Sequence, residues 1–131
     1  MNVSHKKKVL IIDDDPDIVD LIAERLRENN FECFTAHLPA EGLEKAMEFK
    51  PDLVLLDLML PKMSGFGFIR EFKLRSELAN IPVVVLTALA DEDIAQEAMN
   101  LGAAGYLTKA CSAKELVSVV KEYSSAAPDH V

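Results

Sequence analysis

The sequence lacks the basic surplus that would indicate a nucleic-acid-binding protein. Its 14 Lys and Arg residues are outnumbered by 22 Asp and Glu, which gives a formal net charge of -8. Phosphate binding needs a clustered excess of Lys and Arg. The only basic run, residues 5–8, is a solvated segment that leads into the first strand. The charge therefore argues against direct nucleic-acid binding.

Cysteines are scarce and long apolar runs are absent. Cys33 and Cys111 lie far apart and form neither a CxxC pattern nor a cysteine–histidine cluster, so no zinc site or disulfide framework is indicated. No stretch has the apolar core of a signal peptide or the roughly 20 apolar residues of a transmembrane helix. We expect a soluble, cytoplasmic protein with reduced thiols and no membrane contact.

The sequence does have enough apolar residues for one core. Half of its 131 residues are hydrophobic, which suits a single domain. We expect this domain at residues 1–123, with a flexible tail or the start of a linker at 124–131. Short apolar runs alternate with longer amphipathic segments, as in βαβ units. The predicted strands are residues 8–12, 31–36, 53–56, 82–87 and 105–108, and the helices begin near Pro16, Pro39, Ser64, Asp91 and Ser112.

Three of these strands are continuous apolar runs, as expected for strands buried on both faces of a parallel sheet. They are residues 9–12, 53–56 and 83–86, which we place at the centre. Residues 31–35 are interrupted by Glu32 and fit an edge.

Acidic residues gather where two of the central strands end. Asp13, Asp14 and Asp15 follow the first strand, and Asp57 follows the third. Because ligand sites in open parallel sheets lie beyond the carboxyl ends of the strands, these carboxylates are expected to converge. Like charges repel, so the group would need a divalent cation. Asp15, which precedes Pro16, is instead expected to cap the following helix.

The residue types at the strand ends suit phosphoryl transfer. Carboxylates of Asp14 and Asp57 can bind magnesium, which takes one or two carboxylates directly. With the repulsion offset, the carboxylate of Asp57 can attack phosphorus. Lys109 can neutralise phosphate oxygens and the Thr87 hydroxyl can hydrogen-bond one of them. Together these residues predict phosphoryl transfer to Asp57.

Four motifs carry a resemblance to a known family. They are Ile-Ile-Asp-Asp-Asp-Pro at 11–16, Leu-Leu-Asp-Leu-Met-Leu-Pro at 55–61, Val-Leu-Thr-Ala at 85–88 and Gly-Tyr-Leu-Thr-Lys at 105–109. From about Lys7 to Tyr123 the sequence resembles the receiver domain of two-component response regulators. The resemblance implies an α/β, doubly wound, flavodoxin-like fold with five helices and a five-stranded parallel sheet in the order 2-1-3-4-5.

The resemblance also implies roles for single residues. Asp57 is the expected phosphoacceptor, which also binds Mg²⁺. Asp14 binds the metal directly, Asp13 acts through water, and the backbone carbonyl of Met59 is a further ligand. Lys109 is expected to contact the phosphoryl group.

Thr87 and Tyr106 are the implied switch pair: the hydroxyl moves toward the phosphoryl group and the aromatic ring swings inward. An ordinary edge-strand aromatic is the alternative for Tyr106.

The implied donor is the phosphohistidine of a histidine kinase or a histidine phosphotransfer protein. Phosphorylation would then alter a face made by the fourth helix, fifth strand and fifth helix, which binds an unknown downstream target. A phosphorylation-dependent homodimer is also left open. The protein is expected to be a signalling switch and not an enzyme.

The sequence departs from the family pattern at several positions. Ala110 replaces the proline that usually follows the lysine. A cis bond without proline costs about 2.5–4 kcal/mol, so we predict a trans bond and a loop toward Cys111 that shifts or becomes mobile. Met59 and Leu89 stand where the family often has polar side chains that guide hydrolytic water, which predicts slow hydrolysis of the phosphoryl group. Ser64 replaces a frequent acid and can still cap a helix.

Two other functions are alternatives for this sequence. A receiver-like adaptor that binds partners without phosphorylation is supported only by Ala110. A phosphatase-like hydrolase with an aspartyl nucleophile would need a second acid at Met59 to handle the leaving group's proton. Methionine cannot supply that proton, so phosphoryl acceptance by Asp57 is the favoured hypothesis.

Overall fold

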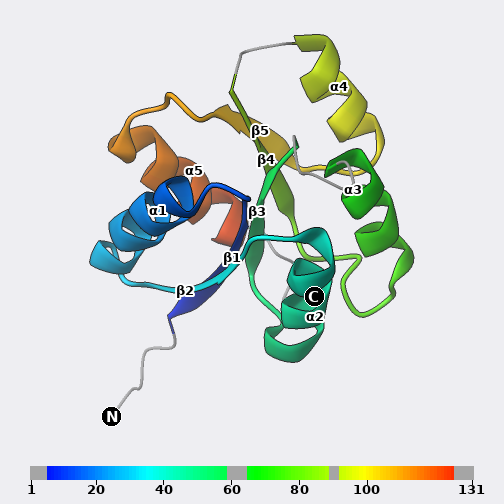
Figure 1. Ribbon diagram of the computed structural model, residues 1–131, viewed down its shortest axis with the longest axis horizontal. Coiled ribbons are helices and arrows are strands. Elements are labelled where there is room, and N and C mark those ends of the chain that lie inside the picture. Colours follow the sequence, from blue (N-terminus) through cyan, green and yellow to red (C-terminus); the bar gives the residue numbers. More distant parts are fainter. Residues whose placement is uncertain (1–5, 59–64, 89–91, 126–131) are drawn as a thin grey trace.

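A computed structural model describes residues 6–58, 65–88 and 92–125. They form a parallel sheet of five strands with helices on both of its faces (Figure 1). The strand order is β2-β1-β3-β4-β5, which confirms the predicted doubly wound fold. In chain order the elements are β1 Lys7–Ile12, α1 Pro16–Glu28, β2 Phe31–Ala36, α2 Pro39–Phe49, β3 Leu53–Asp57, α3 Gly65–Leu74, β4 Val83–Thr87, α4 Glu92–Asn100, β5 Gly105–Thr108 and α5 Ala113–Ser125.

The sheet separates two hydrophobic layers. Helices α1 and α5 cover one face, and α2, α3 and α4 cover the other (Figure 1). Successive side chains of a strand point to opposite faces. Val9 and Ile11 of β1 therefore pack with α1 and α5, whereas Leu10 and Ile12 pack with the other three helices. This two-sided burial explains why the central strands are continuous apolar runs.

The predicted placement of the strands is confirmed. β1, β3 and β4 each have a strand on both sides, whereas β2 pairs only with β1. Glu32 of β2 is exposed, as an edge strand allows.

Local side-chain contacts define where the helices begin. The Asp15 carboxylate accepts hydrogen bonds from the backbone amides of Asp17 at 3.0 Å and Ile18 at 3.5 Å, which confirms its role as N-cap of α1. Ser112 and Glu115 form a capping box at α5, in which each side chain accepts from the other's backbone amide, at 3.0 and 3.1 Å. The cap predicted at Ser64 lies outside the described residues.

Helix α5 is longer than expected. It includes Ser124 and Ser125, which the sequence had assigned to the tail. Ser124 is only 1% exposed, and its hydroxyl donates to the Lys121 carbonyl at 3.4 Å. A small hydroxyl that bonds within its own helix can remain in a buried position, so the helical pattern continues past Tyr123. No described helix is long and apolar enough to span a membrane.

Candidate functional site

The sheet register brings the predicted site residues to one edge. Ile12 pairs with Leu56, so Asp13 and Asp57 follow neighbouring positions of β1 and β3. Thr87 and Thr108 pair at the ends of β4 and β5, and Lys109 comes next. Asp13, Asp57 and Thr87 are buried, whereas Asp14 is exposed. The acids, the hydroxyl and the lysine therefore meet at the carboxyl end of the sheet.

Lys109 connects two of the carboxylates. Its ammonium Nζ lies 2.9 Å from Oδ2 of Asp13 and 3.2 Å from Oδ2 of Asp57. Its backbone amide donates to the Thr87 carbonyl at 2.7 Å. The peptide bonds of the described residues are all trans, which confirms the prediction for Lys109–Ala110. Lys109 is thus held at both its backbone and its side chain without a following proline.

Burial and the contacts between Lys109 and the aspartates shift the pKa values of these side chains in opposite directions. Burial by itself lowers the pKa of the Lys109 ammonium, but its contacts with Asp13 and Asp57 outweigh burial and raise the pKa above its ordinary value. For Asp13, burial has the largest effect and raises the pKa, the amide of Asp15 and the Lys109 ammonium lower it, and with the nearby charge of Asp57 the net result is a pKa above its ordinary value. The site therefore favours additional positive charge.

The carboxylates fit a divalent cation. Asp13, Asp14 and Asp57 each have an oxygen within 4.8 Å of the others. Three carboxylates and one ammonium leave a net charge of -2. At an effective dielectric constant of about 20, two carboxylates with unit charge 4.8 Å apart repel by about 3.5 kcal/mol. The repulsion is smaller where solvent reaches Asp14.

One oxygen of the group is incompletely satisfied. Oδ2 of Asp13 is buried and, although the Lys109 ammonium lies 2.9 Å away, it accepts no hydrogen bond of good geometry from the described residues. A hard cation with oxygen ligands would satisfy it.

The proposed switch residues lie on neighbouring strands. Thr87 ends β4 with a buried side chain, and Tyr106 of β5 is paired with Val85 and is 45% exposed. The ring is therefore partly exposed to solvent, and its switch role stays a prediction. The predictions for the Met59 carbonyl and for Leu89 concern residues outside the described ranges.

Nothing in the sequence assigns a role to His37, which the structure brings next to the site. Its ring Nδ1 lies 3.2 Å from the backbone carbonyl of Asp13. The one signal available was its position directly after β2, the strand that pairs with β1.

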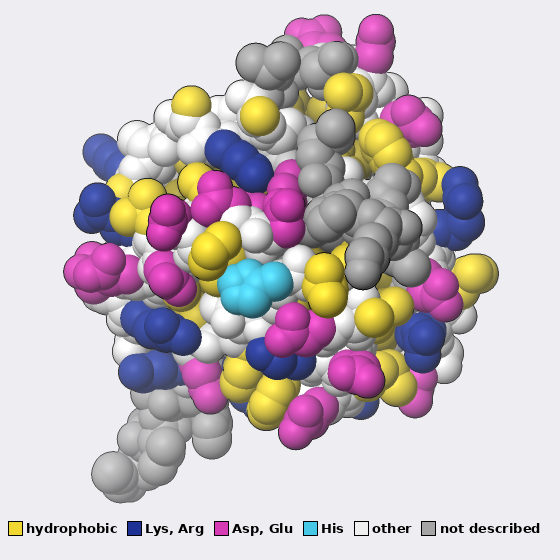
Figure 2. Space-filling view, viewed as in Figure 1, with side chains coloured by type: hydrophobic (Ala, Val, Ile, Leu, Met, Phe, Trp, Pro, Cys, Tyr) yellow, Lys and Arg dark blue, Asp and Glu magenta, His cyan; other side chains and the backbone are white. Residues whose placement is uncertain are grey.

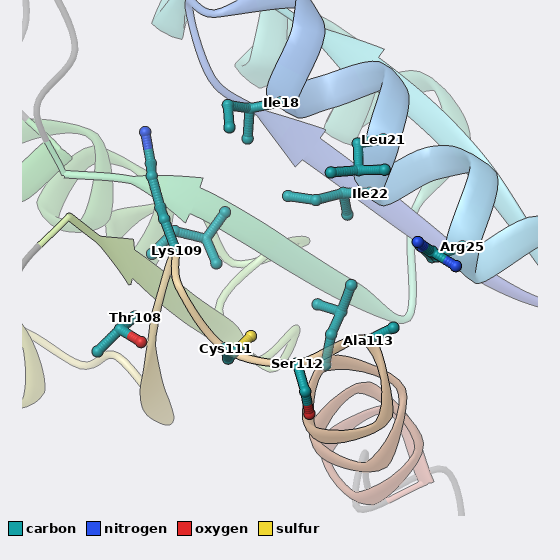
Figure 3. Close-up of a pocket in the computed structure, with 11 residues that line it drawn as sticks. Ile18, Leu21, Ile22, Arg25, Thr108, Lys109, Cys111, Ser112 and Ala113 are labelled. Atoms are coloured by element: carbon teal, nitrogen blue, oxygen red, sulfur yellow. The ribbon is translucent and has the colours of Figure 1, made fainter.

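A separate apolar cavity of about 190 Å³ lies beside Lys109, between α1 and the segment that follows β5. Figure 3 shows Ile18, Leu21 and Ile22 of α1 across from Cys111 and Ala113. None of the three site aspartates lines this cavity, so it is distinct from the acidic site.

Comparison with known proteins agrees with this arrangement. Residues 9–121 match the family model of the response regulator receiver domain. The chain is 37% identical over 115 residues to the phosphate regulon transcriptional regulatory protein PhoB of Pseudomonas aeruginosa, covering 88% of this chain and 50% of PhoB. It is 36% identical over 119 residues to the hybrid signal transduction histidine kinase D of Dictyostelium discoideum, covering 91% of this chain and 8% of that protein. The chain thus spans half or less of the length of these two relatives.

Solved structures show the same fold. The chemotaxis response regulator CheY4 of Vibrio cholerae superimposes with a TM-score of 0.86 at 28% identity, covering 91% of this chain and 99% of that one. A response regulator receiver domain protein from Clostridium thermocellum gives a TM-score of 0.83 at 33% identity, covering 91% and 94%. With the matched motifs at one sheet edge, the chain belongs to the response regulator receiver domain family.

Proposed function

We propose that this receiver domain accepts a phosphoryl group on Asp57 in a Mg²⁺-dependent reaction and then changes its affinity for a partner. The observation that carries the proposal is the contact of the Lys109 ammonium with both Asp13 and Asp57, at 2.9 and 3.2 Å. These contacts place a cation beside the carboxylate that would carry the phosphoryl group.

In the proposed reaction, a carboxylate oxygen of Asp57 attacks the phosphorus of a phosphohistidine on a histidine kinase or a histidine phosphotransfer protein. The new O–P bond forms as the P–N bond breaks, and the leaving imidazole keeps the electron pair and takes a proton. Lys109 neutralises a phosphoryl oxygen. Bound Mg²⁺ would offset negative charge on the reacting oxygens. Asp14 and Asp57 would hold it directly, Asp13 through water, and the Met59 carbonyl would add a ligand.

The response to phosphorylation is proposed to pass through Thr87 and Tyr106. Movement of the Thr87 hydroxyl toward the phosphoryl group would open space beside β5, and the exposed Tyr106 ring would turn into it. The face formed by α4, β5 and α5 would then bind a downstream target or a second copy of the chain. In this proposal the domain is a switch and not an enzyme. It promotes its own phosphorylation, and dephosphorylation is slow because Met59 and Leu89 are apolar.

The structure gives the adaptor alternative little support. That alternative relied on Ala110 leaving Lys109 poorly held. Lys109 instead contacts both buried aspartates and its amide is bonded to Thr87.

The test is labelling by a small-molecule phosphodonor with and without Mg²⁺, followed by mass spectrometry. We expect the intact protein to gain one phosphoryl group only when Mg²⁺ is present, and Asp57→Asn to gain none. Asp20→Asn, which removes an exposed carboxylate of α1, is the matched control and should be labelled like the wild type. Absence of labelling in the folded wild type with excess Mg²⁺ would favour the adaptor function.

A further inference from the structure

Beyond the last paired residues of β1 and β2, the backbone of Asp13 remains bonded to the β2 side, first through Ala36 and then through the side chain of His37. The amide of Asp13 donates to the Ala36 carbonyl at 3.1 Å, one step past the last strand pair. In a continuing parallel ladder the Asp13 carbonyl would next accept from the amide of Leu38. The described backbone contacts contain no such bond, and Nδ1 of His37 lies 3.2 Å from that carbonyl instead. Since a carbonyl only accepts, Nδ1 must carry the hydrogen.

This contact acts on the peptide group that joins Asp13 to Asp14. The Asp13 side chain has its own anchors, because Oδ1 accepts from the Asp15 amide at 3.0 Å and Oδ2 meets Lys109 at 2.9 Å. Asp14 is exposed, and among the described residues no hydrogen bond or ion pair restrains its carboxylate. The direction of the Asp14 side chain therefore depends on its backbone, which the ring of His37 restrains through the preceding carbonyl.

The backbone of His37 is itself held from α2. The amide of His37 donates to Oε1 of Glu41 at 3.0 Å, and Oε2 of Glu41 is paired with Lys45 at 3.4 Å. Lys45 also donates to the Thr35 carbonyl of β2. In the space-filling view histidine atoms lie beside acidic side chains, and His37 is the only histidine in the described part of the chain (Figure 2).

We propose that His37 is a positioning residue for the cation site: by donating from Nδ1 to the Asp13 carbonyl, it orients the Asp13–Asp14 peptide and with it the Asp14 carboxylate. This inference rests on the proposed function, in which Asp14 binds Mg²⁺ directly. It adds a residue of the β2–α2 connection that touches neither the metal nor the phosphoryl group. Replacing the ring by a group without a donor weakens Mg²⁺ binding but leaves the three carboxylates in place.

The experiment compares Mg²⁺ affinity, by calorimetry, in the wild type, His37→Leu, His37→Asn and Ala40→Leu. Leucine removes the donor, whereas the asparagine amide nitrogen can replace Nδ1. Ala40→Leu adds an apolar side chain to the exposed first turn of α2, three residues after His37. Loss of one hydrogen bond predicts about a two- to tenfold rise in the Mg²⁺ dissociation constant for His37→Leu. The asparagine and Ala40→Leu variants should stay within about twofold of the wild type.

A second readout needs no metal. The NMR amide resonance of Asp14 belongs to the peptide whose carbonyl accepts the bond, so it should shift in His37→Leu and return toward its wild-type position in His37→Asn. Urea unfolding checks that the leucine variant keeps its stability. The inference is overturned if His37→Leu binds Mg²⁺ like the wild type, if both His37 variants weaken binding alike, or if affinity is lost only in proportion to stability.

Measurements on the wild type distinguish failure of the His37 role from failure of the proposed function. If it is phosphorylated on Asp57 with Mg²⁺ while His37→Leu binds Mg²⁺ equally well, only the role of His37 fails. If the wild type binds no Mg²⁺, the proposed metal-dependent function and the role of His37 both fail.

Discussion

The first residue of α3 packs against the backbone that follows Asp57. The amide of Gly65 donates to the Leu58 carbonyl at 3.0 Å. A Cβ atom on Gly65 would lie 2.6 Å from Cα of Leu58 and 3.0 Å from its carbonyl oxygen. Carbon atoms in contact prefer about 3.5–4.0 Å. Gly65→Ala therefore requires the two backbone segments to separate by about 0.9 Å.

This separation should affect both stability and phosphorylation. Leu58 is only 2% exposed, so its backbone cannot move without disturbing the core. Overpacking of this kind costs about 1–3 kcal/mol. Because a displacement of about 1 Å at a reacting group can slow a reaction about 100-fold, we expect phosphorylation of Asp57 to slow by roughly 10- to 100-fold. Urea unfolding measures the first effect, and the rate of Mg²⁺-dependent labelling measures the second.

Gly42→Ala is the matched control. Its Cβ would meet Cδ1 of Ile12 at 2.5 Å, which is the end of a side chain and not backbone. The gain in helix propensity of about 1 kcal/mol offsets the cost of moving that methyl group, so stability should change by less than about 1 kcal/mol. Labelling should be unaffected. If Gly65→Ala keeps both wild-type stability and the wild-type labelling rate, the close approach does not constrain the site.

Three further predictions concern the capping, thiol and acid groups. Asp15→Ala removes the N-cap of α1 and should lower the free energy of unfolding by about 1 kcal/mol in urea, whereas Asp15→Asn should lose much less. Burial raises the pKa of the Cys33 thiol to about 11 and also raises that of the less buried Cys111. In native protein at pH 8 an alkylating reagent should therefore modify Cys111 first, as peptide mass spectrometry can show, and equal rates would contradict this. The hydrogen bond from the His37 amide lowers the pKa of Glu41, so its contribution to stability is present above the unfolded pKa and is lost as pH falls through the folded pKa. The difference in unfolding free energy between wild type and Glu41→Gln should consequently shrink below about pH 4.5, and a constant difference would argue against the bond.

The sequence predicted the helices and strands well where a buried apolar run is bounded by a residue that starts or stops an element, such as proline. Residues 31–36 and 105–108 form strands with the predicted bounds. Proline at the first turn marked the starts of α1 and α2. The end of α5 was wrong because serine carries no hydrophobic periodicity, although Ser124 is buried by the fold. Patterns of apolar residues detect the core but not a small polar residue enclosed by it.

The site was predictable to the extent that it depends on strand ends. Asp13 follows β1 and Asp57 ends β3, and the parallel register brings them together. His37 was missed because its contact is with a backbone carbonyl, so no partner residue type reveals it. The difference in burial between Asp13 and Asp14 also depends on the turn after β1, which residue types alone do not define.

The position of Lys109 explains why the missing proline need not impair the site. Its amide bonds to Thr87 and its ammonium contacts two carboxylates, so three contacts hold it, from the residue after β1 and from the last residues of β3 and β4. Phosphorylation would join a carboxylate oxygen of Asp57 to phosphorus and add phosphoryl oxygens of greater negative charge beside Lys109, while Asp13 would stay in place. The ammonium would therefore have an anionic partner in both states. Movement is expected instead at Thr87, whose backbone is bonded to Lys109 but whose hydroxyl can rotate about a single bond.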